Sequence, residues 1–283
     1  MRLAVAEGVK LQVMVEGQGE PVVLLHGHSL DLTVFDEVVP PLVAAGFQVI
    51  RYDQRGHGGS SCPPFGYGWG DHVNDLLGVL THLGLSSAHL VGLSKGGGIA
   101  LEAALRTPQR VQSLALIGPL VPDYPLPAAF GAFFKVFART IREQGVAAAV
   151  REHWLPHPLL RSAWENPSSR EKLERIVLRF PAGEYVATRR DEPDRSWSVL
   201  DRLGDVAVPA LLLVGQREIP EFRAMVDLLA ARLPQAQLVI IPESGHLVPL
   251  EQPEKLAACL LGFLAGLGVR KIHGFLGSAE AQP

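Results

Sequence analysis

The sequence predicts an α/β fold with a mostly parallel central sheet flanked by helices, and three observations support that prediction. Short, near-continuous apolar runs recur along the chain, as in strands that are buried on both faces. Segments of helical periodicity separate these runs, and such alternation is typical of a doubly wound sheet. Between Gly118 and about Asp205 the alternation stops and only helical patterns occur, which indicates an insertion of helices.

The expected elements follow in chain order. Residues 11–15 alternate and residues 17–19 form a turn, which fits two antiparallel strands before the first buried strand. Buried strands are expected at residues 22–25, 49–52, 88–91, 114–117, 211–214 and 238–241. Helices are expected at residues 32–45, 72–83, 97–106, 221–233 and 253–264, and within the insertion at residues 128–144, 146–154, 169–180 and 183–190.

These elements divide the chain into a core, a cap and a tail. The core is expected to comprise residues 1–118 and 205–270, and a helical cap of residues 119–204 is inserted after the sixth strand. Residues 271–283 are interpreted as a C-terminal tail. Most aromatic side chains of the cap are expected to pack it against the core. A minority should line an apolar pocket at the seam, where ligand sites tend to form.

The composition narrows the classes of function. The 283 residues carry a formal net charge of −3, whereas nucleic-acid binding needs a clustered basic face, so no nucleic-acid partner is expected. No apolar run approaches the roughly 20 residues that span a bilayer, and the N-terminal segment lacks the apolar core of a signal peptide. The two cysteines, Cys62 and Cys259, suit a reducing compartment. The sequence therefore predicts a cytoplasmic protein without a membrane partner.

The most informative motif is Gly92-Leu93-Ser94-Lys95-Gly96, which lies between a predicted strand and a predicted helix. A G-x-S-x-G sequence in that setting is a nucleophile elbow, a tight turn that presents the serine hydroxyl. Glycine is required at both ends of the motif because the strand and the helix pass so close that a Cβ would clash. Ser94 is therefore the candidate nucleophile.

A serine nucleophile needs a base and an acid that orients the base. His246, in the loop after the last predicted strand, is the candidate base. Glu218 lies three residues beyond Gly215, which ends the preceding strand, and is the candidate acid. The chain order of serine, acid and histidine is the order expected for such an elbow. Asp123, which follows an earlier strand, stays open as the alternative acid.

Backbone amides are the candidates for an oxyanion hole. His28 follows the strand at residues 22–25, and its N–H should converge with the N–H of Lys95, the residue after the nucleophile. The Lys95 ammonium either steers anionic substrates or points to water, and we favour the second interpretation. His26 and His28 also suggest a metal, but no acidic or cysteine cluster stands near them in sequence. No metal site is therefore expected, and His26 is interpreted as a structural hydrogen-bonding residue.

The glycine-rich segment at residues 52–60 is the other distinctive stretch. It lacks the spacing of a phosphate-binding loop or of a dinucleotide-binding turn. We interpret it as a structural turn after a strand, in which Asp53 and Arg55 brace neighbouring loops.

Together these segments resemble the α/β-hydrolase superfamily, in the branch of small esterases, cofactor-free perhydrolases and 3-oxoadipate enol-lactonases. The resemblance extends over about residues 11–265 and rests on five motifs, His26-Gly27, Asp53 to Gly58, Gly92 to Gly97, Val214 to Glu218 and Ser244 to His246. It implies Ser94 as nucleophile, His246 as base and Glu218 as acid, with the amides of His28 and Lys95 as oxyanion donors. The family more often carries aspartate at the acid position and an apolar residue or glutamine at position 95. Haloalkane dehalogenases and epoxide hydrolases are similar but use an aspartate nucleophile, which Ser94 argues against.

Three functions are compatible with these residues. The first is hydrolysis of carboxylic esters or lactones through an acyl-enzyme, on a small apolar substrate and without metal or organic cofactor. The second is hydrolysis of a C–C bond in an aromatic ring-cleavage product, which the resemblance implies for the same triad. The third is a ligand sensor built on a hydrolase fold. We favour the first function, and the sequence leaves the oligomeric state open, a homodimer included.

Overall fold

The protein is built around one sheet. A computed structural model describes residues 1–188 and 196–267 of the chain. Within these residues the strand order is β1-β2-β4-β3-β5-β6-β7-β8. The pairs β1-β2 and β2-β4 are antiparallel and the other pairs are parallel, so the mostly parallel sheet is confirmed. The strands are β1 (Arg2–Ala6), β2 (Val9–Glu16), β3 (Glu20–Leu25), β4 (Phe47–Tyr52), β5 (Ala88–Leu93), β6 (Val111–Ile117), β7 (Ala210–Gly215) and β8 (Ala236–Ile241).

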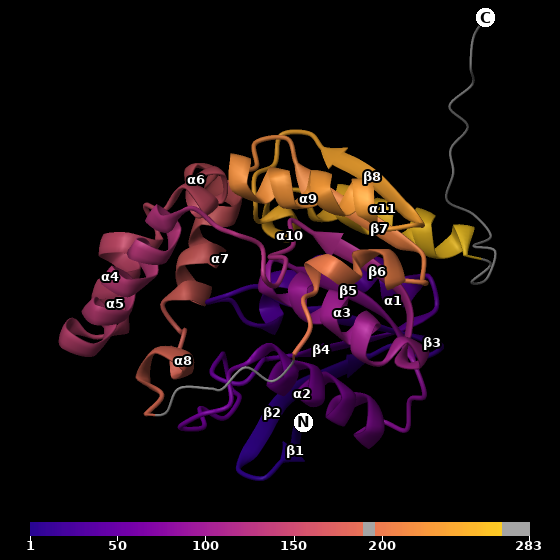
Figure 1. The fold of residues 1–283 in the computed structure, drawn as a ribbon, viewed down its shortest axis with the longest axis horizontal. Helices are drawn as coiled ribbons and strands as arrows, with labels where there is room; N and C mark the ends of the chain where they lie inside the picture. The colour runs from indigo at the N-terminus through magenta and orange to yellow at the C-terminus, as the bar shows by residue number, and fades with distance from the viewer. Residues whose placement is uncertain (189–195, 268–283) are drawn as a thin grey trace, which may run out of the picture.

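Helices cover the sheet, as Figure 1 shows. The helix α1 (Val39–Ala44) packs against β4 and against α11 (Pro253–Gly266), while α2 (Trp69–His82) packs against α3 (Lys95–Arg106). The helix α9 (Pro220–Arg232) packs on β7. Every residue of β5 and β7 is buried, as expected for parallel strands that are covered on both faces. None of the helices in the described parts of the chain is long and apolar enough to cross a membrane.

A group of helices lies between β6 and β7 in the sequence and forms the cap. They are α4 (Ala128–Gln144), α5 (Val146–Ala149), α6 (Pro158–Glu165), α7 (Pro167–Val177) and α8 (Gly183–Val186). Figure 1 shows them grouped to one side of the sheet, so the predicted insertion after the sixth strand is confirmed. The helix predicted at residues 183–190 is too long, because α8 ends at Val186 and residues 187–188 are not helical. Residues 189–190 of that prediction and the predicted tail at residues 271–283 lie outside the described residues.

The helix predicted at residues 32–45 is wrong, because two separate elements occupy that stretch. A 3-10 helix (Leu32–Phe35) comes first, and α1 begins only at Val39. Pro40 and Pro41 lack N–H groups and clash with a preceding helical turn, so a helix tolerates them only in its first turn. The prolines therefore set the start of α1, although the apolar pattern continues across the break.

Candidate active site

Ser94 lies at the turn between β5 and α3, where the motif predicts it. Its φ of 53° and ψ of −116° are uncommon for a residue with a side chain. Backbone hydrogen bonds hold this conformation, because the Ser94 N–H donates to Ile117 O at 2.9 Å and Ser94 O accepts the N–H of Leu120 at 2.9 Å. Ser94 is 8% exposed and lines a cavity. The turn thus presents the serine at the cavity wall.

The two glycines of the motif are required by close contacts between backbone segments. A Cβ on Gly92 would lie 2.4 Å from Gly96 O, and a Cβ on Gly96 would lie 2.2 Å from Leu25 O. Both contacts are with backbone oxygens, which cannot rotate away as a flexible side chain can. The elbow can therefore form only with glycine at these positions.

Gly96→Ala is expected to lower the free energy of unfolding by about 3 kcal/mol or more, because the new methyl group forces β3 and α3 apart. Chemical denaturation measures the effect. Gly262→Ala is the matched control, since a Cβ at that position in α11 would meet nothing within 4 Å. Alanine is the better helix former, so the control should be stabilised by up to about 1 kcal/mol. Equal stability of Gly96→Ala and the wild type would contradict the role given to Gly96.

His246 and Glu218 are brought together from two different loops. Nδ1 of His246 lies 2.7 Å from Oε2 of Glu218, and both side chains are almost fully buried. The other oxygen of Glu218 accepts the N–H of Ile219 at 2.9 Å, which fixes the carboxylate. A ring that donates from Nδ1 has Nε2 free to accept a proton. Asp123, the alternative acid, accepts the N–H of Val199 at 2.9 Å instead.

Glu251 is a residue of the site that sequence reasoning missed. It lies at the end of α10 (Val248–Glu251) and accepts the N–H groups of Gly245 at 2.9 Å and Leu247 at 3.1 Å. These two residues flank His246 in the chain. The hydroxyl of Ser162, a cap residue on α6, donates to the same carboxylate. Glu251 therefore fixes the histidine loop and ties it to the cap, but its sequence setting resembles that of a solvated glutamate.

The predicted oxyanion donors belong to two segments next to Ser94. Lys95 is the first residue of α3, and the first N–H groups of a helix have no partner within that helix. The segment that carries His28 passes close to the nucleophile, because a Cβ on Gly27 would lie 3.2 Å from Ser94 Cβ. His28, Ser94 and Lys95 line the same cavity. Both segments therefore lie close to the nucleophile, and the convergence of their two amides stays a prediction.

The Lys95 side chain does not point to water, so that prediction is wrong. Its Nζ lies 2.9 Å from Oε2 of Glu184 on the cap helix α8, and Lys95 is 8% exposed. A buried ammonium needs a partner, which Glu184 provides. The other oxygen of Glu184 lies 2.9 Å from Nδ1 of His28. Burial acts to raise the pKa of Glu184, but Lys95 and His28 outweigh it and hold that pKa well below its usual value.

The histidines near the site have hydrogen-bond and ion-pair partners within the protein. His26 accepts the N–H of Gln54 at 2.9 Å, and burial lowers its pKa to about 4, so His26 is a neutral structural residue as predicted. His28, His57 and Glu184 bring three potential ligand atoms within 4.8 Å of one another. The Lys95 ammonium already bonds the same carboxylate and supplies the positive charge that a metal ion would bring. These residues therefore fit an ion pair better than a metal.

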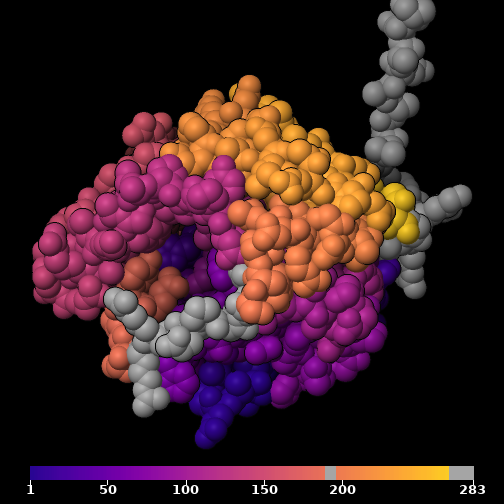
Figure 2. All heavy atoms as spheres, in the orientation of Figure 1, coloured from indigo at the N-terminus to yellow at the C-terminus, as the bar shows by residue number. Residues whose placement is uncertain are grey.

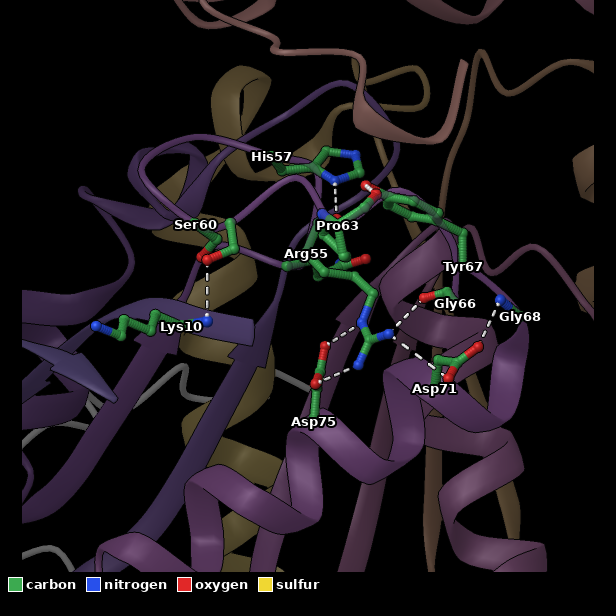
Figure 3. A network of polar contacts seen from close by, with 12 residues as sticks. Lys10, Arg55, His57, Ser60, Pro63, Gly66, Tyr67, Gly68, Asp71 and Asp75 are labelled. Carbon is green, nitrogen blue, oxygen red and sulfur yellow. Dashed lines mark hydrogen bonds and ion pairs between the residues drawn. The ribbon is translucent and has the colours of Figure 1, made fainter. Parts of the chain in front are cut away.

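The segment after β4 braces the loops around the site, as predicted for Asp53 and Arg55. Figure 3 shows the buried Arg55 guanidinium between two acids of α2, with both oxygens of Asp75 at 2.7 Å and Asp71 at 3.5 Å. Burial opposes the charge, but Asp75 and Asp71 outweigh it and raise the pKa of Arg55. The backbone oxygen of Arg55 accepts a hydrogen bond from Nδ1 of His57 at 3.0 Å. Asp53 accepts the N–H groups of residues 32 and 59, at 2.8 and 2.7 Å.

His72, on α2, is an unusual residue of the cavity wall. Both of its ring nitrogens are buried and have no hydrogen-bond partner among the described residues. Burial, together with the positive charges of Lys95 and Arg55, holds the pKa of His72 well below 6.5. The folded protein therefore keeps His72 neutral at a pH where the unfolded chain binds a proton.

This pKa shift predicts a loss of stability in mild acid. Above pH 6.5, the ordinary pKa of histidine, His72 does not lower the free energy of unfolding. Below that pH, each buried histidine of this kind lowers the free energy of unfolding by up to about 1.4 kcal/mol per pH unit, because only the unfolded state gains the proton. We expect the melting temperature to fall between pH 7 and pH 5, and to fall less in His72→Leu. His26, His57, His89 and His157, whose pKa values burial also lowers, contribute to the remaining fall. Asp53, whose pKa burial raises to about 6, opposes it, because the folded state then gains a proton before the unfolded state does. Equal falls in the variant and the wild type would contradict the prediction.

The site opens into a cavity of about 690 Å³, within the usual range for small-molecule sites. Figure 2 shows a hollow between the cap and the core. Most of the cavity wall is aliphatic or aromatic, with Leu30, Trp69, Leu120, Leu126, Phe130, Phe134, Trp154, Leu159, Leu160 and Phe222. Several of these rings come from the cap, so the predicted apolar pocket at the seam between cap and core is confirmed.

Comparisons with known proteins point to one fold family. Residues 20–253 match the family model of the alpha/beta hydrolase fold. The chain is 29% identical over 266 residues to 2-hydroxy-6-oxo-6-phenylhexa-2,4-dienoate hydrolase of Burkholderia cepacia, with 88% of this chain and 89% of that protein covered. A thermophilic esterase from Thermogutta terrifontis superposes with a TM-score of 0.79 and 30% identity, over 92% of this chain and 94% of the other. An enol-lactonase from Burkholderia xenovorans shares the fold, with a TM-score of 0.77, 22% identity and coverage of 93% and 99%.

Proposed function

The chain belongs to the α/β-hydrolase superfamily, and from that premise we propose that it is a serine hydrolase of carboxylic esters or lactones. The observation that carries the proposal is the 2.7 Å hydrogen bond between His246 and Glu218, with His246 and Ser94 on the wall of one cavity. The strained turn at Ser94 adds support, because it presents a hydroxyl and a helix N-terminus to the same space. The similarity to an esterase at 30% identity agrees with this chemistry.

In the proposed mechanism Ser94 Oγ attacks the carbonyl carbon while Nε2 of His246 takes the hydroxyl proton. Glu218 holds the proton of the ring on Nδ1 and stabilises the imidazolium that forms. The amides of His28 and Lys95 donate to the oxyanion of the tetrahedral intermediate. His246 then protonates the leaving alcohol, and water releases the acyl group by the same steps in reverse.

The cavity wall favours an apolar group on the substrate. Hydrolysis of p-nitrophenyl esters from acetate to octanoate tests the proposal and measures the usable length of the cavity. We expect turnover with an optimum at an intermediate chain length, because a longer acyl chain gains apolar contacts until it no longer fits the cavity. Folded protein that turns over none of these esters would contradict the simple esterase.

Hydrolysis of C–C bonds is the second candidate, because the curated relative from Burkholderia cepacia is a dienoate hydrolase by name. A vinylogous diketone of the ring-cleavage type discriminates between the two. Turnover of the diketone without turnover of esters would favour C–C hydrolysis. Binding of such compounds without turnover of either class would favour the ligand sensor.

A further inference from the structure

The cavity holds an ion pair that the proposed mechanism does not use. Lys95 Nζ and Glu184 Oε2 lie 2.9 Å apart, and both residues line the cavity next to Ser94. Among the described residues of the cavity wall, Lys95 is the one lysine or arginine and Glu184 the one aspartate or glutamate. A substrate therefore meets a positive or a negative charge from these residues only where Lys95 and Glu184 do not neutralise each other.

The cap segment that carries Glu184 is held firmly against the core. Glu184 bonds His28 with its second oxygen, and the hydroxyl of the next residue, Tyr185, lies 3.1 Å from Nε2 of the same ring. Gly183 fits tightly over the core, because a Cβ there would lie 2.5 Å from the hydroxyl of Tyr67 and 2.8 Å from Gly56 Cα. That hydroxyl is in turn fixed by its bond to the backbone oxygen of residue 63 at 2.8 Å (Figure 3). The carboxylate is thus fixed beside Lys95.

We propose that Glu184 is a specificity-determining residue that makes the site select substrates without a charge on the acyl group. This inference rests on the proposed ester hydrolase function. A carboxylate that enters the cavity loses its hydration, finds the Lys95 charge already compensated and meets the negative charge of Glu184. A neutral acyl chain meets a cavity with no net charge from this pair. Removal of the Glu184 charge would leave Lys95 free to bind an anion.

The test compares two esters of the same shape in wild type and Glu184→Gln. They are mono-p-nitrophenyl succinate and p-nitrophenyl 4-methylpentanoate, in which an isopropyl group replaces the carboxylate. We expect Glu184→Gln to raise the ratio of kcat/KM for succinate over 4-methylpentanoate by about 10- to 100-fold, the usual range for one charge-assisted hydrogen bond. A change in folding or cap position would alter both esters together and leave the ratio unchanged.

Two further variants separate charge from structure. Lys95→Met keeps the backbone amide but removes the ammonium that faces Glu184 Oε2 and leaves only the contact of Oε1 with His28, so the ratio should fall below that of the wild type. The double variant Lys95→Met with Glu184→Gln should lose the gain of the single glutamine variant. An unchanged ratio in Glu184→Gln, with melting temperatures that show folded protein, would overturn the proposal. Should Glu184→Gln fail to fold, an unchanged ratio in Lys95→Met would overturn it equally.

A binding measurement keeps this inference separate from the proposed function. If the wild type hydrolyses neither ester, the serine hydrolase proposal fails, and calorimetric binding of hexanoate and hexanamide replaces the rate ratio. We then expect Glu184→Gln to strengthen hexanoate binding at least about tenfold relative to hexanamide. Equal changes for the two ligands would overturn the role of Glu184 whatever the outcome for catalysis.

Discussion

Ser94→Ala is expected to lower kcat/KM for a p-nitrophenyl ester by about 10⁴- to 10⁶-fold, because no other group in the proposed mechanism can form the acyl-enzyme. The fold should persist, since the bonds that hold the turn involve only the backbone of residue 94. Steady-state rates and thermal melts measure the two effects. Well-folded variant protein that keeps the wild-type rate would contradict Ser94 as nucleophile.

Ser113→Ala is the matched control, because Ser113 belongs to a similar chain of side chains elsewhere in the protein. Its hydroxyl lies 2.8 Å from Nδ1 of His89, and Nε2 of His89 lies 3.2 Å from Glu20. Ser113 is 1% exposed within β6 and is absent from the described wall of the cavity. We expect Ser113→Ala to keep its turnover. A serine, a histidine and a glutamate near one another do not by themselves make an active site. Of these two serines, only Ser94 also lies at a helix N-terminus and on the wall of a cavity.

Most of the core could be predicted from the sequence because its determinants are local. Apolar runs mark the buried strands, although the run at residues 238–241, also predicted as buried, forms the edge strand β8, in which Leu238 and Ile240 are exposed. The glycines at positions 92 and 96 mark a turn whose close contacts lie within a few residues or on the neighbouring strand. The break before α1 was also local, but the apolar pattern across residues 32–45 concealed the effect of two prolines. Local rules therefore place elements well and place their ends less well.

The partners of Lys95 and of the loop that carries His246 could not be predicted in the same way. Lys95 meets Glu184 across 89 positions of sequence, and Glu251 meets Ser162 across the same number. Both pairs join the core to the cap, and no pattern within either segment distinguishes these glutamates from solvated ones. Their roles arise only when the cap packs over the strand ends. Contacts between segments this far apart in sequence leave no local pattern, so they could not be predicted.

Glu218→Gln is expected to lower kcat by about 10²- to 10⁴-fold, by analogy with the corresponding change in serine proteases. The glutamine amide can donate to Nδ1 of His246, which moves the ring proton to Nε2, the atom that must accept the proton of Ser94. KM should change far less, because Glu218 lies behind the ring and is absent from the described wall of the cavity. Steady-state kinetics of the folded variant separate the two parameters.

Asp123→Asn is the control that decides between the two candidate acids. Asp123 accepts the N–H of Val199, and asparagine keeps an oxygen that can accept the same bond. We therefore expect kcat close to that of the wild type. A large loss in Asp123→Asn together with full activity in Glu218→Gln would transfer the role of the acid to Asp123. Comparable losses of kcat in Asp123→Asn and Glu218→Gln would mean that the loop after β6, which carries Asp123, matters as much for the position of His246 as Glu218 does.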